Sequence, residues 1–117
     1  IESIAPIILQ NIFFNTGSAD LLPESSQEIA LISNMMSENK NISIQIIGHT
    51  DDVGNDADNQ LLSEQRAKAV ATAIIAKGIS PARIQSIGKG ETQPIAENTS
   101  DEGRRKNRRT EMLVKIQ

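Results

Sequence analysis

The chain has 117 residues, enough for one hydrophobic core and too few for two independent domains. It contains no cysteine, which excludes disulfides and thiolate metal sites, and its two phenylalanines are its only aromatic residues. Five of its twelve Lys and Arg side chains fall within residues 103–109, whereas the rest of the chain is acidic. This distribution suits a small anionic group better than a nucleic-acid backbone, so we expect no nucleic-acid partner.

The first half of the sequence predicts two strands and a helix. Residues 6–14 read as a first strand, followed by a polar loop over residues 15–20. The helix that follows has two rival start signals, Pro23 at a first helical position and Ser25 with Glu28 as a capping box. It runs toward residue 38. Isoleucines at positions 42, 44 and 46 alternate with polar residues, which predicts a half-buried strand over residues 42–47.

One stripe of apolar side chains in the first helix is expected to face the core. Its members recur at helical spacing and are Ile29, Ile32 and Met36, with Leu31 and Met35 at its flanks.

The second half predicts a long helix and two further strands. Turn-forming residues at 56, 58 and 59 precede a helix whose core face carries Leu62, Ala69, Val70, Ala73 and Ile74. Lys77 and Gly78 end it, and a strand follows over residues 84–87. After a loop over residues 91–98, Thr99 and Glu102 are placed to cap a short helix. Every second residue from 110 to 116 would lie on one face of a last strand.

These elements follow the order β-α-β-α-β, a short helix and a final β-strand. This order predicts an α/β protein of the α+β sandwich type, with two helices packed on one face of a mixed four-stranded sheet. Right-handed crossovers would bring the loops over residues 15–20, 48–58 and 88–98 to a common edge. We expect the ligand there.

Polar side chains cluster where the strand over residues 42–47 gives way to the long helix. Asn59, Ser63 and Arg66 are three to four residues apart and share one side of that helix, next to the loop that carries Asp51. A carboxylate and a guanidinium can therefore face one gap.

Two sets of motif residues stand in order along the chain. The first set is Gly48-His49-Thr50-Asp51, Gly54, Asn59, Leu62-Ser63, Arg66-Ala67 and Val70. The second set is Gly88, Gly90-Glu91, Pro94-Ile95, Asn98, Gly103-Arg104, Asn107-Arg108-Arg109 and Glu111. At these positions the sequence resembles the OmpA-like peptidoglycan-binding domain family, and the resemblance covers about residues 12 to 116.

The ligand that this resemblance implies is diaminopimelate in the stem peptide of Gram-negative-type peptidoglycan, whose free end carries an ammonium and a carboxylate on one carbon. Asp51 is then the acceptor for the ammonium, and Arg66 is the bidentate partner of the carboxylate, a role that lysine cannot fill equivalently. The implied ligand-binding residues are Asp51, Arg66, Asn59, Thr50, Asn15 and Arg108. No cofactor or metal is implied.

The resemblance also implies a place in the cell. We expect residues 1–117 to be a single domain, excised from a longer protein, that lies in the periplasm of a Gram-negative bacterium. Its function would be non-covalent anchoring of an outer-membrane or other envelope protein to the cell wall. The chain departs from the family pattern at Asn15, where many members have Asp. It also departs at Ala57 and Asp58, where an aromatic residue often precedes the Asn, and at Lys89, where an aromatic residue often separates the two glycines. These departures bear on affinity.

Two other functions compete with anchoring. One is peptidoglycan hydrolysis using His49 and Asp51. However, a single histidine without cysteine makes a poor metal site, and no nucleophile-elbow pattern surrounds any serine, so we expect a structural histidine and no enzyme. The other is a protein-interaction domain whose pocket has lost its ligand. Asn59 similarly has an alternative role in helix capping.

Overall fold

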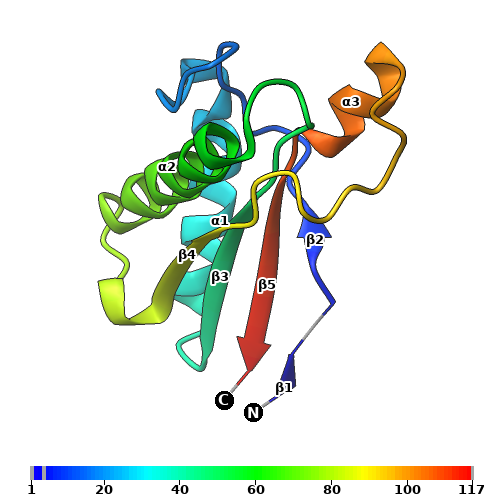
Figure 1. Ribbon diagram of the computed structural model, residues 1–117. Helices are drawn as coiled ribbons and strands as arrows, with labels where there is room; N and C mark the ends of the chain where they lie inside the picture. Colours follow the sequence, from blue (N-terminus) through cyan, green and yellow to red (C-terminus); the bar gives the residue numbers. More distant parts are fainter. Residues whose placement is uncertain (1, 4, 117) are drawn as a thin grey trace.

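A computed structural model describes residues 2–3 and 5–116 of the chain (Figure 1). The helices and strands occur in the following order: β1 (Glu2–Ser3), β2 (Ile7–Ile8), the 3-10 turn η1 (Pro23–Ser25), α1 (Ser26–Glu38), β3 (Ile42–Gly48), α2 (Asp56–Ile75), the 3-10 turn η2 (Pro81–Arg83), β4 (Ile84–Gly88), α3 (Asp101–Asn107) and β5 (Thr110–Ile116).

The sheet is mixed, with β3 near its centre. β3 pairs antiparallel with β5 along its whole length and parallel with β4 on its other side. The short strands β1 and β2 pair one after the other with the outer edge of β5, so together they fill a single strand position. The sheet therefore has four strand positions, and the predicted fold class is confirmed.

The core lies between one face of the sheet and the helices α1 and α2. Alternation along β3 and β5 brings Ile44 opposite Val114 and Ile46 opposite Met112 on this face. The predicted stripe of α1 is buried there, with Met36 fully enclosed, while Leu31 is 60% exposed. The buried core residues are Leu9, Ile29, Ile32, Met36, Ile42, Ile44, Ile46, Ala67, Val70, Ala71, Ile74, Ile79, Ile84, Met112 and Val114.

The predicted core face of helix α2 is confirmed at Val70 and Ile74 and differs from the observed one at its other positions. The buried side chains of this helix are Asn59, Ser63, Ala67, Val70, Ala71 and Ile74, whereas Leu62, Ala69 and Ala73 are only partly buried. Small residues on this face let the helix backbone lie close to the ends of β3 and β4. A Cβ atom on Gly48 would stand 2.4 Å from the Ser63 carbonyl oxygen, and one on Gly88 would stand 2.4 Å from the Glu64 backbone nitrogen.

The predicted first strand is wrong in extent. Only Ile7 and Ile8 form a strand, and the Leu9 backbone N–H donates once more to the Thr110 carbonyl before the chain turns away. The side chain of Ser25 then holds the chain, because its Oγ accepts from the Phe13 N–H at 2.8 Å and lies 3.3 Å from the Phe13 carbonyl. Ser25 is therefore occupied and does not cap α1 through its side chain.

Two other helix starts also differ from the predictions. Helix α2 begins at Asp56 with Asn55 as its cap, because the Asn55 Oδ1 atom accepts from the Asp58 N–H at 2.7 Å. The capping role considered for Asn59 is thereby wrong. Helix α3 is capped by Ser100, whose Oγ accepts from the Gly103 N–H at 3.0 Å, and not by Thr99.

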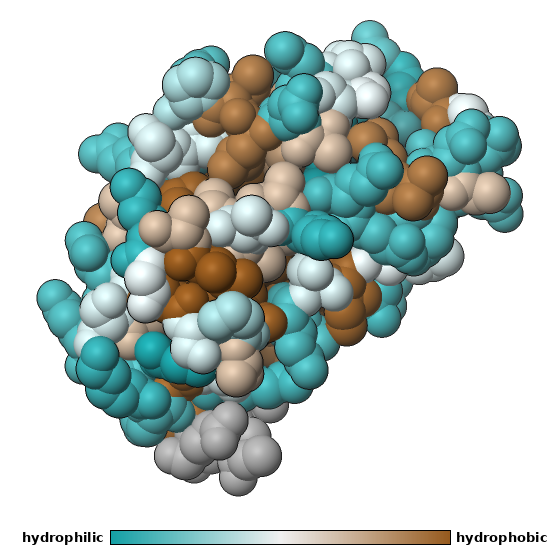
Figure 2. Space-filling model, turned by 90° about the vertical axis from the view of Figure 1, so that its left-hand side faces the viewer, coloured by the Kyte–Doolittle hydropathy of each residue, from teal (hydrophilic) through white to brown (hydrophobic). Residues whose placement is uncertain are grey.

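On the face that Figure 2 shows, hydrophilic side chains lie around the periphery and apolar side chains gather between them. Of the helices in the described residues, none is long and apolar enough to cross a membrane.

We predict that Gly48→Ala destabilises the domain by about 2–3 kcal/mol, because the added methyl group overlaps backbone atoms of α2 that cannot move alone. The measurement is urea unfolding followed by circular dichroism. Gly78→Ala is the control: its Cβ meets no atom within 4 Å, so only its φ of 101° opposes the change, at a cost of roughly 1–2 kcal/mol. Equal stabilities of Gly48→Ala and the wild type would contradict the close packing.

Candidate functional site

A cavity of about 990 Å³ lies at the edge of the sheet where β3 and β4 end and β5 begins. The loops that follow β3 and β4 are joined there, because the Thr50 N–H donates to the Gly90 carbonyl and the Lys89 N–H donates to the Gly48 carbonyl. The loop over residues 15–20 reaches the same place through contacts with Arg66. The predicted meeting of three loops at one edge is therefore confirmed.

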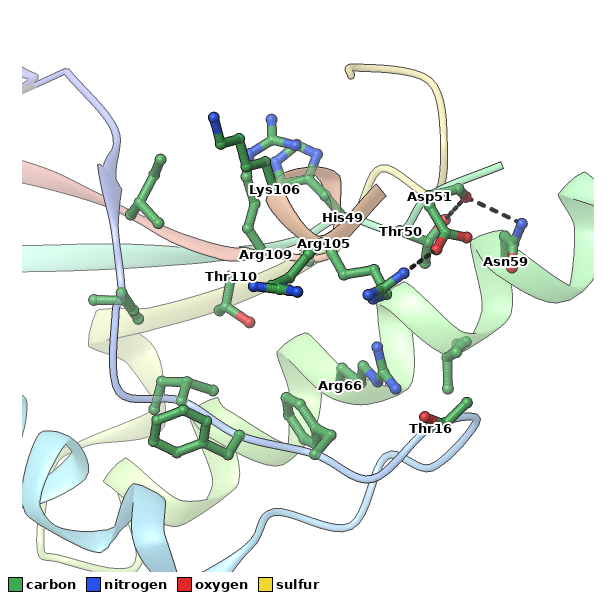
Figure 3. A pocket seen from close by; sticks show the side chains of 18 of the residues that line it. Thr16, His49, Thr50, Asp51, Asn59, Arg66, Arg105, Lys106, Arg109 and Thr110 are labelled. Carbon is green, nitrogen blue, oxygen red and sulfur yellow. Dashed lines mark hydrogen bonds and ion pairs between the residues drawn. The ribbon is translucent and has the colours of Figure 1, made fainter. Parts of the chain in front are cut away.

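Asp51 stands on the loop after β3 and is only 7% exposed. Its Oδ1 atom accepts from the Val53 N–H at 3.0 Å, which fixes the carboxylate relative to its own loop. Its Oδ2 atom lies 2.5 Å from the Nη1 atom of Arg108, which precedes β5 (Figure 3). The carboxylate is thus held in place with one oxygen turned toward a cation.

Arg66 projects from α2 into the same cavity and is held by main-chain oxygens. Its Nε–H donates to the Ser18 carbonyl at 2.8 Å, and its Nη2 donates to the Asn15 carbonyl at 3.1 Å. The guanidinium also lies over the Phe14 ring, with its Cζ atom 5.0 Å from the ring centroid. Among the described residues it pairs with no carboxylate. Burial, together with the nearby charge of Arg108, lowers the pKa of Arg66 against the opposing effect of Asp51.

Asn59 and Thr50 hold the Asp51 loop from behind. The Asn59 Nδ2 atom lies 3.0 Å from the Val53 carbonyl, 3.3 Å from the Asp51 carbonyl and 3.0 Å from a carboxylate oxygen of Glu91. The Thr50 hydroxyl donates to the Asp51 carbonyl at 2.8 Å. Both side chains line the cavity, but their donors are used within the protein. The geometry therefore fits a positioning role for them.

Asn15 reaches the site with its main chain. Its carbonyl accepts from Arg66, while the residue is exposed and does not line the cavity. The structure thus brings Asp51, Arg66, Asn59, Thr50 and Arg108 to one cavity, and leaves the side chain of Asn15 outside it.

The basic cluster over residues 103–109 divides into side chains with different partners. Arg104 pairs with Asp101 and the Asn98 carbonyl. Arg109 is buried against Glu111 and the Gln93 carbonyl. Arg105 and Lys106 are exposed, yet both line the cavity. The sequence does not indicate this difference among the five basic residues, since spacing alone does not show which side of a short helix lies at a cavity.

His49 belongs to a buried network beneath the site. Its Nε2 atom lies 2.9 Å from Glu111, which also accepts from Arg109 at 3.0 Å, and its Nδ1 atom is buried without a partner. Burial lowers the pKa of His49 against the hydrogen bond to Glu111. Burial opposes ionisation of Glu111, but hydrogen bonds from Arg109 and His49 outweigh it, so the pKa of Glu111 is lowered.

The site has the groups of a binding pocket. It presents a fixed carboxylate and a separate guanidinium to one space, and the hydrogen bond of His49 goes to Glu111 and to neither of these groups. No cluster of three or more potential metal-ligating side chains occurs in the part of the chain that the structure describes. The arrangement can hold a ligand that carries both charges.

We predict that the free energy of unfolding falls as the pH drops below about 6.5. The unfolded chain protonates His49 near that value, whereas the folded chain protonates it only at lower pH, so the unfolded state binds more protons in between. Protonation of Glu111 lowers the free energy of unfolding further as the pH falls below 4.5, the ordinary pKa of a glutamate, because its pKa is lowered in the folded chain. Urea unfolding between pH 5 and 8 measures this dependence, and His49→Gln should flatten it just below pH 6.5. An unchanged slope in that variant would assign the effect elsewhere.

Comparison with known proteins gives a consistent result. The sequence profile of the OmpA family matches residues 13–108. The chain is 35% identical over 104 residues to outer membrane porin F of Pseudomonas fluorescens, covering 89% of this chain and 32% of the porin. It is 36% identical over 103 residues to the peptidoglycan-binding protein ArfA of Mycobacterium tuberculosis, covering 88% of this chain and 32% of ArfA. The chain thus spans about a third of the length of these two relatives.

A solved structure shares the fold. A MotB-like protein from Desulfovibrio vulgaris superposes with a TM-score of 0.82 at 33% identity, covering 91% of this chain and 68% of that one.

Proposed function

The chain belongs to the OmpA family, and we propose that it binds peptidoglycan non-covalently through the diaminopimelate of the stem peptide. The observation that carries the proposal is the placement of Asp51 and Arg66 on the wall of one cavity, each held by separate contacts. The free end of diaminopimelate is a zwitterion on one carbon, and it needs one anion and one cation held apart.

Arg66 retains the donors that this role needs. A guanidinium has five N–H groups, and the carbonyls of Ser18 and Asn15 take one on Nε and one on Nη2. Both hydrogens on Nη1 and one on Nη2 remain, so the end of the guanidinium can donate two parallel hydrogen bonds to a carboxylate. Each charge-assisted contact of this kind contributes roughly 1.5–3 kcal/mol.

Asp51 accepts the ligand ammonium in exchange for its present partner. Arg108 contacts the Oδ2 atom of Asp51 with a side chain that is 45% exposed, and it can therefore leave without unpacking the core. The ammonium then takes the same oxygen, while Arg108 turns toward a ligand carboxylate. Asn59 and Thr50 keep the Asp51 loop in position during this exchange.

The domain is a binding module and not an enzyme, as befits a member of this family. The relatives named above include an outer-membrane protein and a peptidoglycan-binding protein. We place the domain in the periplasm, where it would anchor an outer-membrane or other envelope protein to the cell wall. If the domain were instead a hydrolase, it would release soluble fragments from purified sacculi. If it were a protein-interaction domain whose pocket has lost its ligand, it would fail to sediment with the sacculi.

We predict that Asp51→Asn and Arg66→Lys each weaken binding to a diaminopimelate-containing muropeptide by at least tenfold, measured by isothermal titration calorimetry. The first change removes the charge that attracts the ammonium, and the second removes the planar pair of donors. The matched controls are Asp52→Asn and Lys68→Gln, whose exposed side chains lie next to Asp51 on its loop and two residues after Arg66 on α2.

The controls should bind as the wild type does. Circular dichroism and unfolding curves of all four variants separate lost binding from lost structure. Wild-type affinity in both Asp51→Asn and Arg66→Lys would overturn the assignment of these residues.

A further inference from the structure

The cavity carries more positive charge than a zwitterion needs. Asp51 is the one carboxylate among its lining residues, whereas five cationic residues line it: Arg66, Arg105, Lys106, Arg108 and Arg109. Glu111 neutralises Arg109 from behind, and Asp51 pairs with Arg108. A bound diaminopimelate end brings one positive and one negative charge and leaves the excess unchanged.

Arg105 and Lys106 account for most of this excess. Both come from α3, across the cavity from Arg66 on α2 (Figure 3). Arg105 has no hydrogen-bonding or ionic partner among the residues described, and Lys106 lies 3.8 Å from Glu102 with both side chains largely exposed. Such an exposed pair contributes little and does not prevent Lys106 from contacting a ligand.

The cavity also has room beyond one amino-acid residue. Its volume of about 990 Å³ is at the upper end of the range of roughly 300–1,000 Å³ that holds drug-sized ligands. Asp51 and Arg66 would engage only the free end of diaminopimelate. The remaining wall, of which α3 forms part, is therefore available to the rest of the stem peptide.

We propose that Arg105 and Lys106 form a second anion subsite that selects stem peptides with a free carboxylate besides those of diaminopimelate. The carboxylate concerned is the α-carboxylate of the neighbouring γ-linked glutamate, which is either free or amidated in peptidoglycans. This inference rests on the proposed function and adds to it the chemical form of the ligand. A free carboxylate is ionised near neutral pH and meets two cations, whereas an amide is neutral and gains no ionic contact.

The experiment is a calorimetric titration of the 117-residue domain with two muropeptides that both contain diaminopimelate with free carboxylates. They differ only in the glutamate, which is a free acid in one and an amide in the other. The wild type should bind the acid roughly three- to tenfold more tightly. Arg105→Gln/Lys106→Gln should bind both forms equally, at the wild-type affinity for the amide. Lys68→Gln/Lys77→Gln is the control, since it removes the same net charge from exposed positions away from this cavity.

The outcomes separate the two proposals. Preference for the acid that is lost only in Arg105→Gln/Lys106→Gln supports the subsite. Equal binding of both muropeptides by the wild type overturns the subsite and leaves diaminopimelate recognition standing. A preference for the free-acid muropeptide that persists in Arg105→Gln/Lys106→Gln also overturns the subsite. Binding of neither muropeptide by the folded wild type overturns the proposed function, and the subsite with it.

Discussion

The close approach of α2 to the ends of β3 and β4 is the constraint on which the site depends. Side chains larger than hydrogen at Gly48 and Gly88 would push the helix away from the sheet. At this distance the Ser63 hydroxyl reaches the Gly90 N–H, and the Asn59 amide reaches the carbonyls of the Asp51 loop. The packing that closes the core thus also fixes the loop carrying the carboxylate and the helix carrying the guanidinium relative to one another.

The second condition for binding is that the charged groups are held before a ligand arrives. Main-chain carbonyls of the loop over residues 15–18 orient Arg66 without neutralising it, because they carry no net charge. Asp51 is treated differently, since Arg108 pairs with it directly. The anion is therefore screened by an exchangeable partner, while the cation keeps its full charge for the ligand. Pre-ordering of this kind reduces the entropy that is lost on binding.

The sequence predicted those elements whose pattern is strong and independent of distant contacts. β5 was predicted within its observed bounds, and β3 to within one residue, because apolar and polar residues alternate along both. The first strand was predicted too long, since its end is decided by a hydrogen bond between Ser25 and Phe13, twelve residues apart. The starts of α2 and α3 were also predicted wrongly, because several neighbouring residues in each sequence could cap the helix.

Within the site, the positions of Asp51 and Arg66 on one cavity followed from spacing and from the family resemblance. The ion pair between Asp51 and Arg108 did not, because it joins residues 57 positions apart through the antiparallel pairing of β3 and β5. That Arg105 and Lys106 line the cavity depends on where α3 lies in the fold, which the local sequence does not show. Local chemistry was therefore readable from sequence, whereas the pairing of charges was not.

The most direct test of zwitterion recognition is an NMR titration of the domain with a diaminopimelate-containing muropeptide and with its lysine-containing equivalent, which lacks the carboxylate beside the free ammonium. We expect saturable shifts of the backbone amides around Asp51 and of the Arg66 side chain with the first ligand, and at least tenfold weaker binding of the second. Equal affinity for the two ligands would contradict recognition of the zwitterionic end by Asp51 and Arg66.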